Sequence, residues 1–277
     1  MATTSFVPKL WDARLIANLD KTLVYANLCN RDYEGEIRSA GDTVHINKLN
    51  ALTVKDYTGT VTSEELGGTS LDLVIDQQKY FSFKVDDILK VQSNLALVDS
   101  AMQQAAYALS DKADQTIAGL YAQAGTQIGS DESATKIGTT NKAYDALIDM
   151  GVALTENNVP TSGRFIVVPA WFEGLLRKDD RMVSTGDAAA QAARINGYLG
   201  RVAGFDVYVS NNLPNTEGTL YKIIAGNNTA MSYAQQILNT ESFRDQTSFA
   251  DIVRGLMVYG VKVVQPQALV CMTANKG

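Results

Sequence analysis

The side chains that most often carry enzyme chemistry are few and scattered in this sequence. The chain has a single histidine, His45, and it lies inside a segment predicted to be a strand of an exposed ribbon. One histidine cannot supply an HExxH zinc site, and a catalytic triad would depend on this one residue in an open location. We therefore expect a structural role for His45, no metal site and no cofactor.

Two pairs of neighbouring aspartates are the other candidates for chemistry. Asp86 precedes Asp87, and Asp179 precedes Asp180. Paired carboxylates can hold a metal ion or share a proton, but basic residues flank both pairs, and this pattern favours surface charge networks. A small hydrolase that uses His45, Asp179 or Asp180 remains an alternative, and it requires those side chains to line one pocket. The flanking basic residues are Lys84, Lys90, Arg177, Lys178 and Arg181.

Glycine spacing and net charge exclude two further classes of binding protein. Gly197, Gly200 and Gly204 do not fit G-x-G-x-x-G, they precede a predicted strand, and no G-x-x-x-x-G-K-S/T run occurs. The formal net charge is -6. Because phosphate binding relies on clustered Lys and Arg, this acidic balance argues against a protein that reads nucleic acid.

Neither secretion nor membrane insertion is predicted. Residues Met1–Leu15 contain no apolar run, so we expect no signal peptide and a chain that stays where it is made. The apolar segment Gly255–Val264 is interrupted by Lys262 and is shorter than the roughly 18 residues that a membrane span needs. Cys29 and Cys271 lie in no Cys-x-x-Cys pattern, so we expect two reduced structural thiols.

The first 87 residues predict an arm followed by a long hairpin. Helical spacing fades after Leu28, so we expect an extended arm that holds one short helix. Four later segments are rich in strand-forming residues, and Thr58–Thr69 between them has the composition of an exposed loop tip. A two-stranded ribbon is marginally stable in water, so it must pack on a neighbouring subunit or on the sheet of its own domain. The four segments are Thr43–Asn47, Leu52–Tyr57, Leu71–Ile75 and Lys79–Val85.

The strongest periodic pattern predicts one long amphipathic helix. It begins after Ser93 or Asn94, either of which can cap it, and it ends at Gly125, which can adopt the left-handed conformation of many helix ends. Its length would be roughly 45 Å, which is typical of a scaffold element. Its apolar stripe consists of Leu95, Val98, Met102, Ala105, Leu109, Ala113, Ile117, Leu120 and Ala124.

After a loop at Gln127–Thr140, alternating helices and strands predict a second, α+β domain. Thr140 or Asn141 can cap its first helix. The expected buried face of that helix consists of Tyr144, Leu147, Ile148, Gly151 and Leu154. The following segments predict a buried strand at Phe165–Val168, a helix at Ala170–Lys178, strands at Phe205–Val209 and Tyr221–Ala225, and a short helix at Thr229–Gln236.

Three strands are predicted in the last part of the chain, and we expect them to return to the long helix and cover its apolar stripe. They are Ile237–Phe243, Leu256–Val264 and Ala268–Thr273.

Several blocks in fixed order resemble the coat-protein branch of the tailed-phage major capsid protein family, which has the Hong Kong 97-like fold. The similarity runs nearly end to end and includes AGDTVHI at Ala40–Ile46, VKDYTG at Val54–Gly59 and GRVAGFDVYVSNNLP at Gly200–Pro214. The other blocks are Phe6–Ile37, Leu73–Asp87, Gln103–Tyr121 and Phe165–Arg181.

The resemblance implies an α+β fold with named parts. These are an N-terminal arm (1–42), an extended E-loop β-ribbon (43–87), a P-domain with its long spine helix (88–140), an α/β axial A-domain (141–236) and the return strands of the P-domain (237–277).

The resemblance also implies the function of a major capsid protein, a structural protein of the virion and not an enzyme. Copies would form pentamers and hexamers and self-assemble into an icosahedral head that encloses phage double-stranded DNA without reading its sequence. Because few residues precede the arm, we expect a separate scaffolding protein, as well as a portal, and assembly in the host cytoplasm. A shell protein of a cellular nanocompartment with the same fold is the alternative.

Contacts between subunits are expected in the arm, at the ribbon tip and around the second aspartate pair. Trp171 and Phe172 could be core anchors or part of such an interface. The predicted contact residues are Trp11, Arg14, Lys55, Asp56, Tyr57, Glu64, Glu65, Asp179, Asp180 and Arg181.

Overall fold

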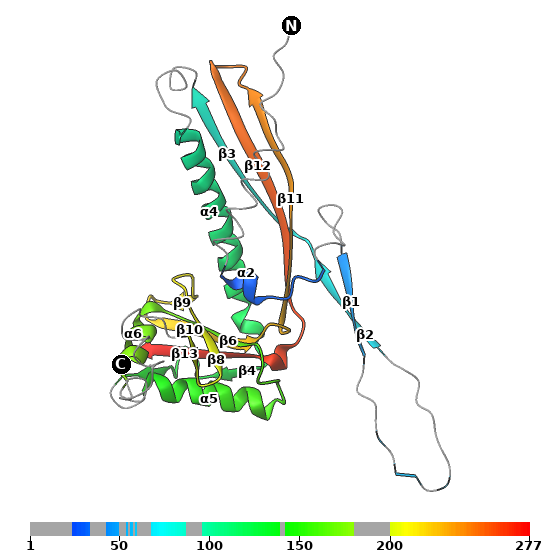
Figure 1. Cartoon of the computed structure of the whole chain (residues 1–277), viewed down its shortest axis with the longest axis vertical. Helices are drawn as coiled ribbons and strands as arrows, with labels where there is room; N and C mark the ends of the chain where they lie inside the picture. The colour runs from blue at the N-terminus through cyan, green and yellow to red at the C-terminus, as the bar shows by residue number, and fades with distance from the viewer. Residues whose placement is uncertain are drawn as a thin grey trace.

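The protein consists of a long part, a compact part and a ribbon that projects to one side (Figure 1). The computed structural model describes residues 24–33, 43–49, 54, 56–57, 59, 68–86, 96–138, 142–179 and 200–277. The fold is α+β, as predicted, with one long helix on a three-stranded sheet and two shorter helices beside an eight-stranded sheet. No helix in these ranges is both long and apolar enough to cross a membrane.

The predicted long helix is present as α4 (Ala96–Ala118), and it continues as one 3-10 segment, η2 (Gly119–Gln123). The expected left-handed glycine at its end is wrong, because Gly125 does not have a positive φ. Gly125 is instead required by close approach. Its N–H donates to the Pro266 carbonyl at 2.7 Å, and a Cβ atom there would lie 2.6 Å from the same oxygen.

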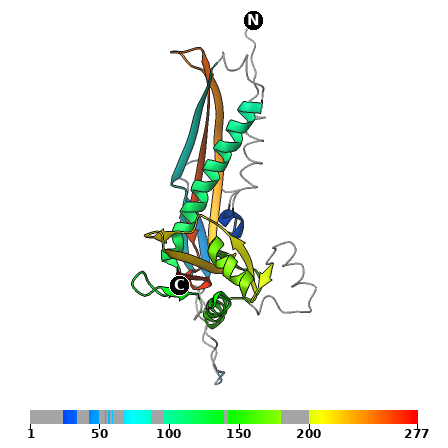
Figure 2. The ribbon, with the colours of Figure 1, turned by 90° about the vertical axis from the view of Figure 1, so that its left-hand side faces the viewer.

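A three-stranded antiparallel sheet lies along α4 (Figures 1 and 2). Its strand order is β11 (Met231–Arg244), β12 (Ala250–Val263), β3 (Gln77–Asp86). The inward stripe of α4 and the sheet residues that face it share one hydrophobic core. Its members here include Met102, Leu109, Ile117, Phe81, Phe83, Val253 and Met257.

The predicted short helix at Thr229–Gln236 is wrong. The chain turns at Ala230, whose N–H donates to the Asn227 carbonyl at 2.9 Å, and Met231 already begins β11. Residue-by-residue pairing with β12 and burial of Tyr233 outweigh the helical preference of the Ala and Gln residues in this segment.

The compact part is built on an eight-stranded sheet. Its central path runs β4–β13–β10–β6–β8–β7, with β5 paired to β13 and β9 paired to β10. The buried strand predicted at Phe165–Val168 is confirmed as β6, and the helix predicted at Ala170–Lys178 is confirmed as α6. The strands are β4 (Thr126–Ile128), β5 (Thr135–Ile137), β6 (Arg164–Val168), β7 (Arg201–Val202), β8 (Phe205–Val209), β9 (Asn215–Thr216), β10 (Leu220–Asn227) and β13 (Leu269–Lys276).

The last strand does not return to the long helix as expected. After the 3-10 turn η3 (Pro266–Ala268), β13 crosses into the compact part and pairs with β10 along seven residues. Six of its eight residues are buried, so an almost continuous apolar strand belongs at the centre of a sheet with both faces covered. Only β11 and β12 of the three tail strands lie beside α4.

Helix α5 (Ala143–Glu156) buries only part of the predicted face. Leu147 and Leu154 are buried as expected. Its capping position is Lys142, and the predicted caps Thr140 and Asn141 lie outside the described residues. Ile148 was expected inside, but its side chain is 40% exposed. Both sets of apolar residues fit a helical period, and the packing selects the one with small residues near the sheet. The buried residues of α5 are Ala143, Ala146, Leu147, Met150 and Leu154.

Arg164, the first residue of β6, fixes the end of α5 onto the sheet. Its guanidinium donates to the carbonyls of Val159 at 2.6 Å, Pro160 at 2.9 Å and Gly151 at 3.3 Å, and to Thr155 Oγ1 at 3.1 Å. The cation also lies where a helix C-terminus favours positive charge. Burial lowers the pKa of this guanidinium.

The substitution Arg164→Met should destabilise the unassembled subunit by about 3 kcal/mol, because buried carbonyl groups lose their donor. The measurement is urea-induced unfolding followed by circular dichroism. The matched control is Arg177→Met, which removes an exposed ion pair with Glu173 on α6 and should cost less than about 1 kcal/mol. Equal losses in the two variants would contradict this account of Arg164.

Candidate assembly surface

The predicted hairpin is present as a two-stranded ribbon with two unlike faces. Strands β1 (Thr43–Leu49) and β2 (Gly68–Val74) pair antiparallel from Thr43 opposite Val74 to Leu49 opposite Gly68. The outer face carries His45, whose Nδ1 lies 2.7 Å from Asp72 Oδ1 across the strands. The inner face forms a second hydrophobic cluster with the side of the three-stranded sheet that α4 leaves free. Its buried members are Val44, Ile46, Leu73, Ile75, Ala234 and Val258.

Close backbone contact fixes the base of this ribbon. A Cβ atom at Gly260 of β12 would lie 2.4 Å from the Val74 carbonyl oxygen, so only glycine fits where the ribbon crosses the sheet. Strand β3, which was expected to belong to the ribbon region, leaves it and pairs with β12. Of the two packing partners expected for the ribbon, a neighbouring subunit or its own domain, the base of the ribbon packs on a sheet of its own subunit.

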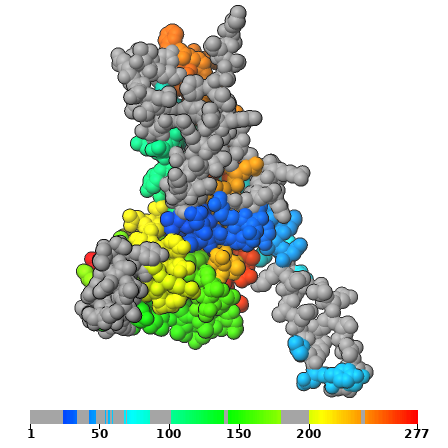
Figure 3. Space-filling view, in the orientation of Figure 1, coloured from blue at the N-terminus to red at the C-terminus, as the bar shows by residue number. Residues whose placement is uncertain are grey.

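The tip of the ribbon, by contrast, exposes apolar side chains. Val54 is 97% exposed and Tyr57 is 76% exposed, and Asp56 beside them is also exposed. The described tip residues stand clear of the long and compact parts (Figure 3). Large apolar side chains on a projecting segment are typical of a surface that contacts another molecule. Lys55, Glu64 and Glu65 lie outside the described residues.

The end of the arm lies across the junction of the long and compact parts (Figure 3). Its short helix, α2 (Tyr25–Leu28), confirms the predicted helix of the arm. Asn30 joins this segment to β11 by two backbone hydrogen bonds, from its N–H to the Met231 carbonyl at 2.8 Å and from Tyr233 N–H to its carbonyl at 2.9 Å. The guanidinium carbon of Arg31 lies 5.9 Å from the centre of the Tyr233 ring.

Asp114 of α4 holds the beginning of α2. Its carboxylate accepts hydrogen bonds from the backbone N–H groups of Val24 at 3.3 Å and Tyr25 at 3.2 Å. The residue is only 3% exposed. Burial raises the pKa of its carboxyl from 3.8 to about 6, although the backbone N–H groups oppose the shift. The charged form is therefore costly, but it caps backbone groups that would otherwise lack an acceptor.

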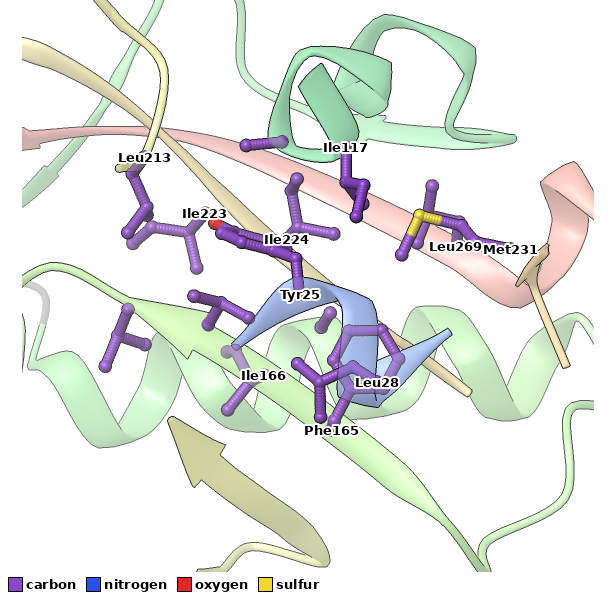
Figure 4. Close-up of a cluster of buried hydrophobic side chains, with 14 of the residues drawn as sticks. Tyr25, Leu28, Ile117, Phe165, Ile166, Leu213, Ile223, Ile224, Met231 and Leu269 are labelled. Carbon is purple, nitrogen blue, oxygen red and sulfur yellow. The ribbon is translucent and has the colours of Figure 1, made fainter. Parts of the chain in front are cut away.

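Hydrophobic packing supplies the rest of the attachment. Figure 4 shows Tyr25 and Leu28 of α2 among Ile117 of α4, Phe165 of β6 and Ile224 of β10. Tyr25, Ile117 and Ile224 are fully buried. The end of the arm is thus part of the core that joins the two sheets.

His45 and Asp179, the described candidates for a hydrolase site, do not line one pocket. His45 lies on the ribbon and Asp179 follows α6 in the compact part, and these elements are far apart in Figure 1. The groove beside α5 contains neither residue. Within the described ranges, no group of three or more His, Cys, Asp or Glu residues could hold a metal ion. Cys29 and Cys271 are free and buried, and burial raises the pKa of each thiol to about 12.

The remaining predicted contact residues divide between the core and the part of the chain outside the description. Asp179 is only 6% exposed, which differs from the surface network expected for it. Phe172 is fully buried, and Trp171 packs edge-on against Phe172 and Tyr221. The contact residues outside the described ranges are Trp11, Arg14, Asp180 and Arg181, and Asp87 of the first aspartate pair also lies outside them.

Two features of the surface and junction were not predicted. Asp114 interrupts the apolar stripe of α4 beside Ala113 and Ile117, and a carboxylate so close to the inward face was a signal for a buried partner. The exposed apolar side of α5 is the second feature. Its signal in the sequence was an apolar pattern too wide for one face of a helix.

Comparisons with known proteins give one consistent result. The phage capsid protein family matches residues 70–272. A structure from Mycobacterium phage Che8 is 34% identical, with a TM-score of 0.76 and coverage of 90% of each chain. The capsid of cyanophage P-SCSP1u is 18% identical, with a TM-score of 0.70 and coverage of 92% of this chain and 89% of that one.

The fold is also similar to that of a virus-like particle from a cellular organism. A virus-like particle from Pyrococcus furiosus is 12% identical, with a TM-score of 0.60 and coverage of 97% of this chain and 100% of that one. This likeness shows the shared fold alone. No protein with a curated description matches the sequence.

The raised pKa of Asp114 predicts a pH dependence of stability. Because the folded-state pKa is about 6 and the ordinary value is 3.8, the native state binds the proton more tightly, and the stability contributed by the neutral form is lost as the pH rises through about 6. The free energy of unfolding of the wild type, measured relative to Asp114→Asn, should therefore rise as the pH falls from about 6 to about 4.

Urea unfolding of both unassembled proteins at several pH values measures this difference, and all other titrating groups are common to the two. A difference that falls with falling pH, or that does not change, would show that burial does not control this carboxyl.

Proposed function

Because this chain belongs to the phage capsid protein family, we propose that its copies assemble into pentamers and hexamers and, from these, into an icosahedral head. It is a major capsid protein that forms the head shell, with the Hong Kong 97-like fold. The observation that carries the assignment is the 34% identity to the Che8 chain across 90% of both proteins. The role is structural, and we assign no catalytic activity to it.

The ribbon supports assembly by contact with neighbours. Its base packs on its own sheet, but its tip presents Val54 and Tyr57 to solvent. A neighbouring subunit can cover these side chains and Asp56, and repetition by symmetry multiplies a modest contact. The proposed contact set keeps Lys55, Glu64 and Glu65 at the tip, Trp11 and Arg14 in the arm, and Asp180 and Arg181 beyond α6. Asp179 is left out of the set because it is buried within the subunit.

The proposed domains follow the family anatomy with one change. We assign residues 1–42 to the arm, 43–87 to the E-loop region, 88–140 to the P-domain with α4 as its spine helix, and 141–236 to the axial A-domain. Strand β12 and the part of β11 from residue 237 onward complete the P-domain. Strand β13 is hydrogen-bonded to β10, so we place it with the A-domain although it lies within 237–277.

The contents and partners of the shell are part of the same proposal. The head encloses phage double-stranded DNA without reading its sequence, a separate scaffolding protein and a portal take part, and assembly occurs in the host cytoplasm. The net charge of -6 supports a container, since an acidic subunit does not grip the genome by counterion release.

Electron microscopy of the purified protein, with its scaffolding protein where required, tests the function. Uniform shells that contain capsomers are expected. A protein that stays monomeric under all assembly conditions would contradict the proposal, and shells loaded with an enzyme in their native source would favour the nanocompartment instead.

Removal of the ribbon tip should separate folding from assembly. Leu49 and Gly68 are direct partners, so an Asn-Gly turn in place of residues 50–67 can close the hairpin. Thermal unfolding should change by no more than a few degrees, because the buried base remains, whereas shells should be absent by electron microscopy. Tyr57→Phe, which keeps the ring, is the control and should assemble. Normal shells from the shortened protein would refute the role of the tip.

A further inference from the structure

The outer face of α5 carries a second apolar stripe that the chain covers only in part, since Tyr144 packs against the core but Ile148 and Val152 are exposed. Tyr144, Ile148 and Val152 follow one another at four-residue spacing and therefore lie on one side of the helix. Ile148 is 40% exposed and Val152 is 48% exposed, whereas Leu147 and Met150 on the other side are fully buried. A helix that is apolar on two sides is typical of one that is buried on both.

The stripe lines an open groove of about 400 Å³. Gly151 and Ala203, which also line it, have little or no side chain, so the groove has room for side chains of a partner. Arg164 forms part of the wall, and its hydrogen bonds to the last turn of α5 and the loop after it hold that wall in place. The surface is thus already formed in the single subunit.

Charges at the two ends of α5 are of opposite sign. The helix has no basic residue; Asp145 lies in its first turn, and Asp149 at its middle and Glu156 at its end are exposed. Lys142, directly before the helix, is exposed, as are Lys136 on β5 and Lys276 on β13. The last two lie at adjacent positions of paired strands. The three exposed lysines outnumber the one carboxylate, Asp145, at the beginning of α5, so we name this region the basic end, whereas the rest of the helix carries only acidic charges.

We infer that the groove of Tyr144, Ile148 and Val152 is the contact surface for the basic end of a second copy of this chain. The inference rests on the proposed function, which makes a second copy the available partner. Lys142 and Glu156 are separated by 14 residues of rigid helix, or roughly 21 Å, so they cannot meet within one subunit. A second copy placed head to tail brings them together.

Binding of a second copy in the α5 groove is compatible with the symmetry of a ring. A contact between two different patches of one surface is heterologous, and it closes into a ring when the rotation between subunits allows. Opposite charges around an apolar centre fix the register of such a contact and exclude the reversed orientation, which would bring like charges together. The contact therefore orders subunits around a ring and is distinct from the ribbon tip.

The first experiment places a charge in the apolar stripe. Ile148→Asp and Val152→Asp should leave the thermal unfolding of the subunit almost unchanged, because both side chains are exposed, but should lower the yield of shells by about tenfold or more. Ile148→Leu is the matched control and should assemble normally. Shells from both Asp variants at the wild-type yield would overturn the inference, while a wild type without shells would overturn the proposed function instead.

The second experiment exchanges the charges. Asp149→Lys with Glu156→Lys should reduce assembly, as should Lys136→Glu with Lys142→Glu, since each creates a repulsive contact. The protein that carries all four changes should recover shells, because the opposite charges meet again with their signs exchanged. The head-to-tail contact would be refuted if the protein with all four substitutions is folded by circular dichroism but forms no more shells than either double variant.

Discussion

The structure depends on one shared core at the end of α4. The lower half of this helix packs on the three-stranded sheet through Ala113 and on the end of the arm through Asp114, while Ile117 reaches the cluster between the two parts. Without this core the two parts would be joined by the chain itself and by polar contacts such as the hydrogen bond from Asn212 Nδ2 to Asp111 Oδ1 at 2.6 Å. A buried carboxylate is tolerated there since it caps the backbone of α2, and its neutral form stays accessible near pH 6.

The elements that could be predicted from the sequence are those whose pattern has one solution. The stripe of α4 repeats over many turns, and Phe165–Val168 is apolar at every position, so both were correct. Thr229–Gln236 was wrong because its side chains suit a helix, while its partner residues in β12, Val258–Val263, lie far along the sequence and decide the outcome. The face of α5 was partly wrong for a different reason: Leu147 and Leu154 are buried as predicted, but the helix has two apolar sides and the sequence does not say which one its own sheet covers.

The candidate surface was predicted in part. The part that was not predicted again depends on contacts between residues that are distant in sequence. A loop tip with Val54 and Tyr57 could be read from the chain, because turn residues surround it. The junction could not, since Asp114 and Tyr25 are 89 positions apart and only the folded chain brings them together. Asp179 was expected on the surface because charged residues flank it in the sequence, yet it is only 6% exposed at the end of α6.

Surplus apolar surface is what connects the fold to assembly. A single domain of this size normally hides its large apolar side chains or scatters the exposed ones. Here Val54 and Tyr57 are exposed at the end of a projecting ribbon, and Ile148 and Val152 are exposed along one side of α5, although both elements already bury another apolar face. Further exposed aromatic side chains, Tyr80, Tyr107 and Phe249, lie in the long part. An element with two apolar faces leaves one of them exposed to water in the free subunit, and contact with a neighbour removes this unfavourable exposure. Because every copy carries both surfaces, each new contact leaves another of the same kind open until the ring and the shell are closed.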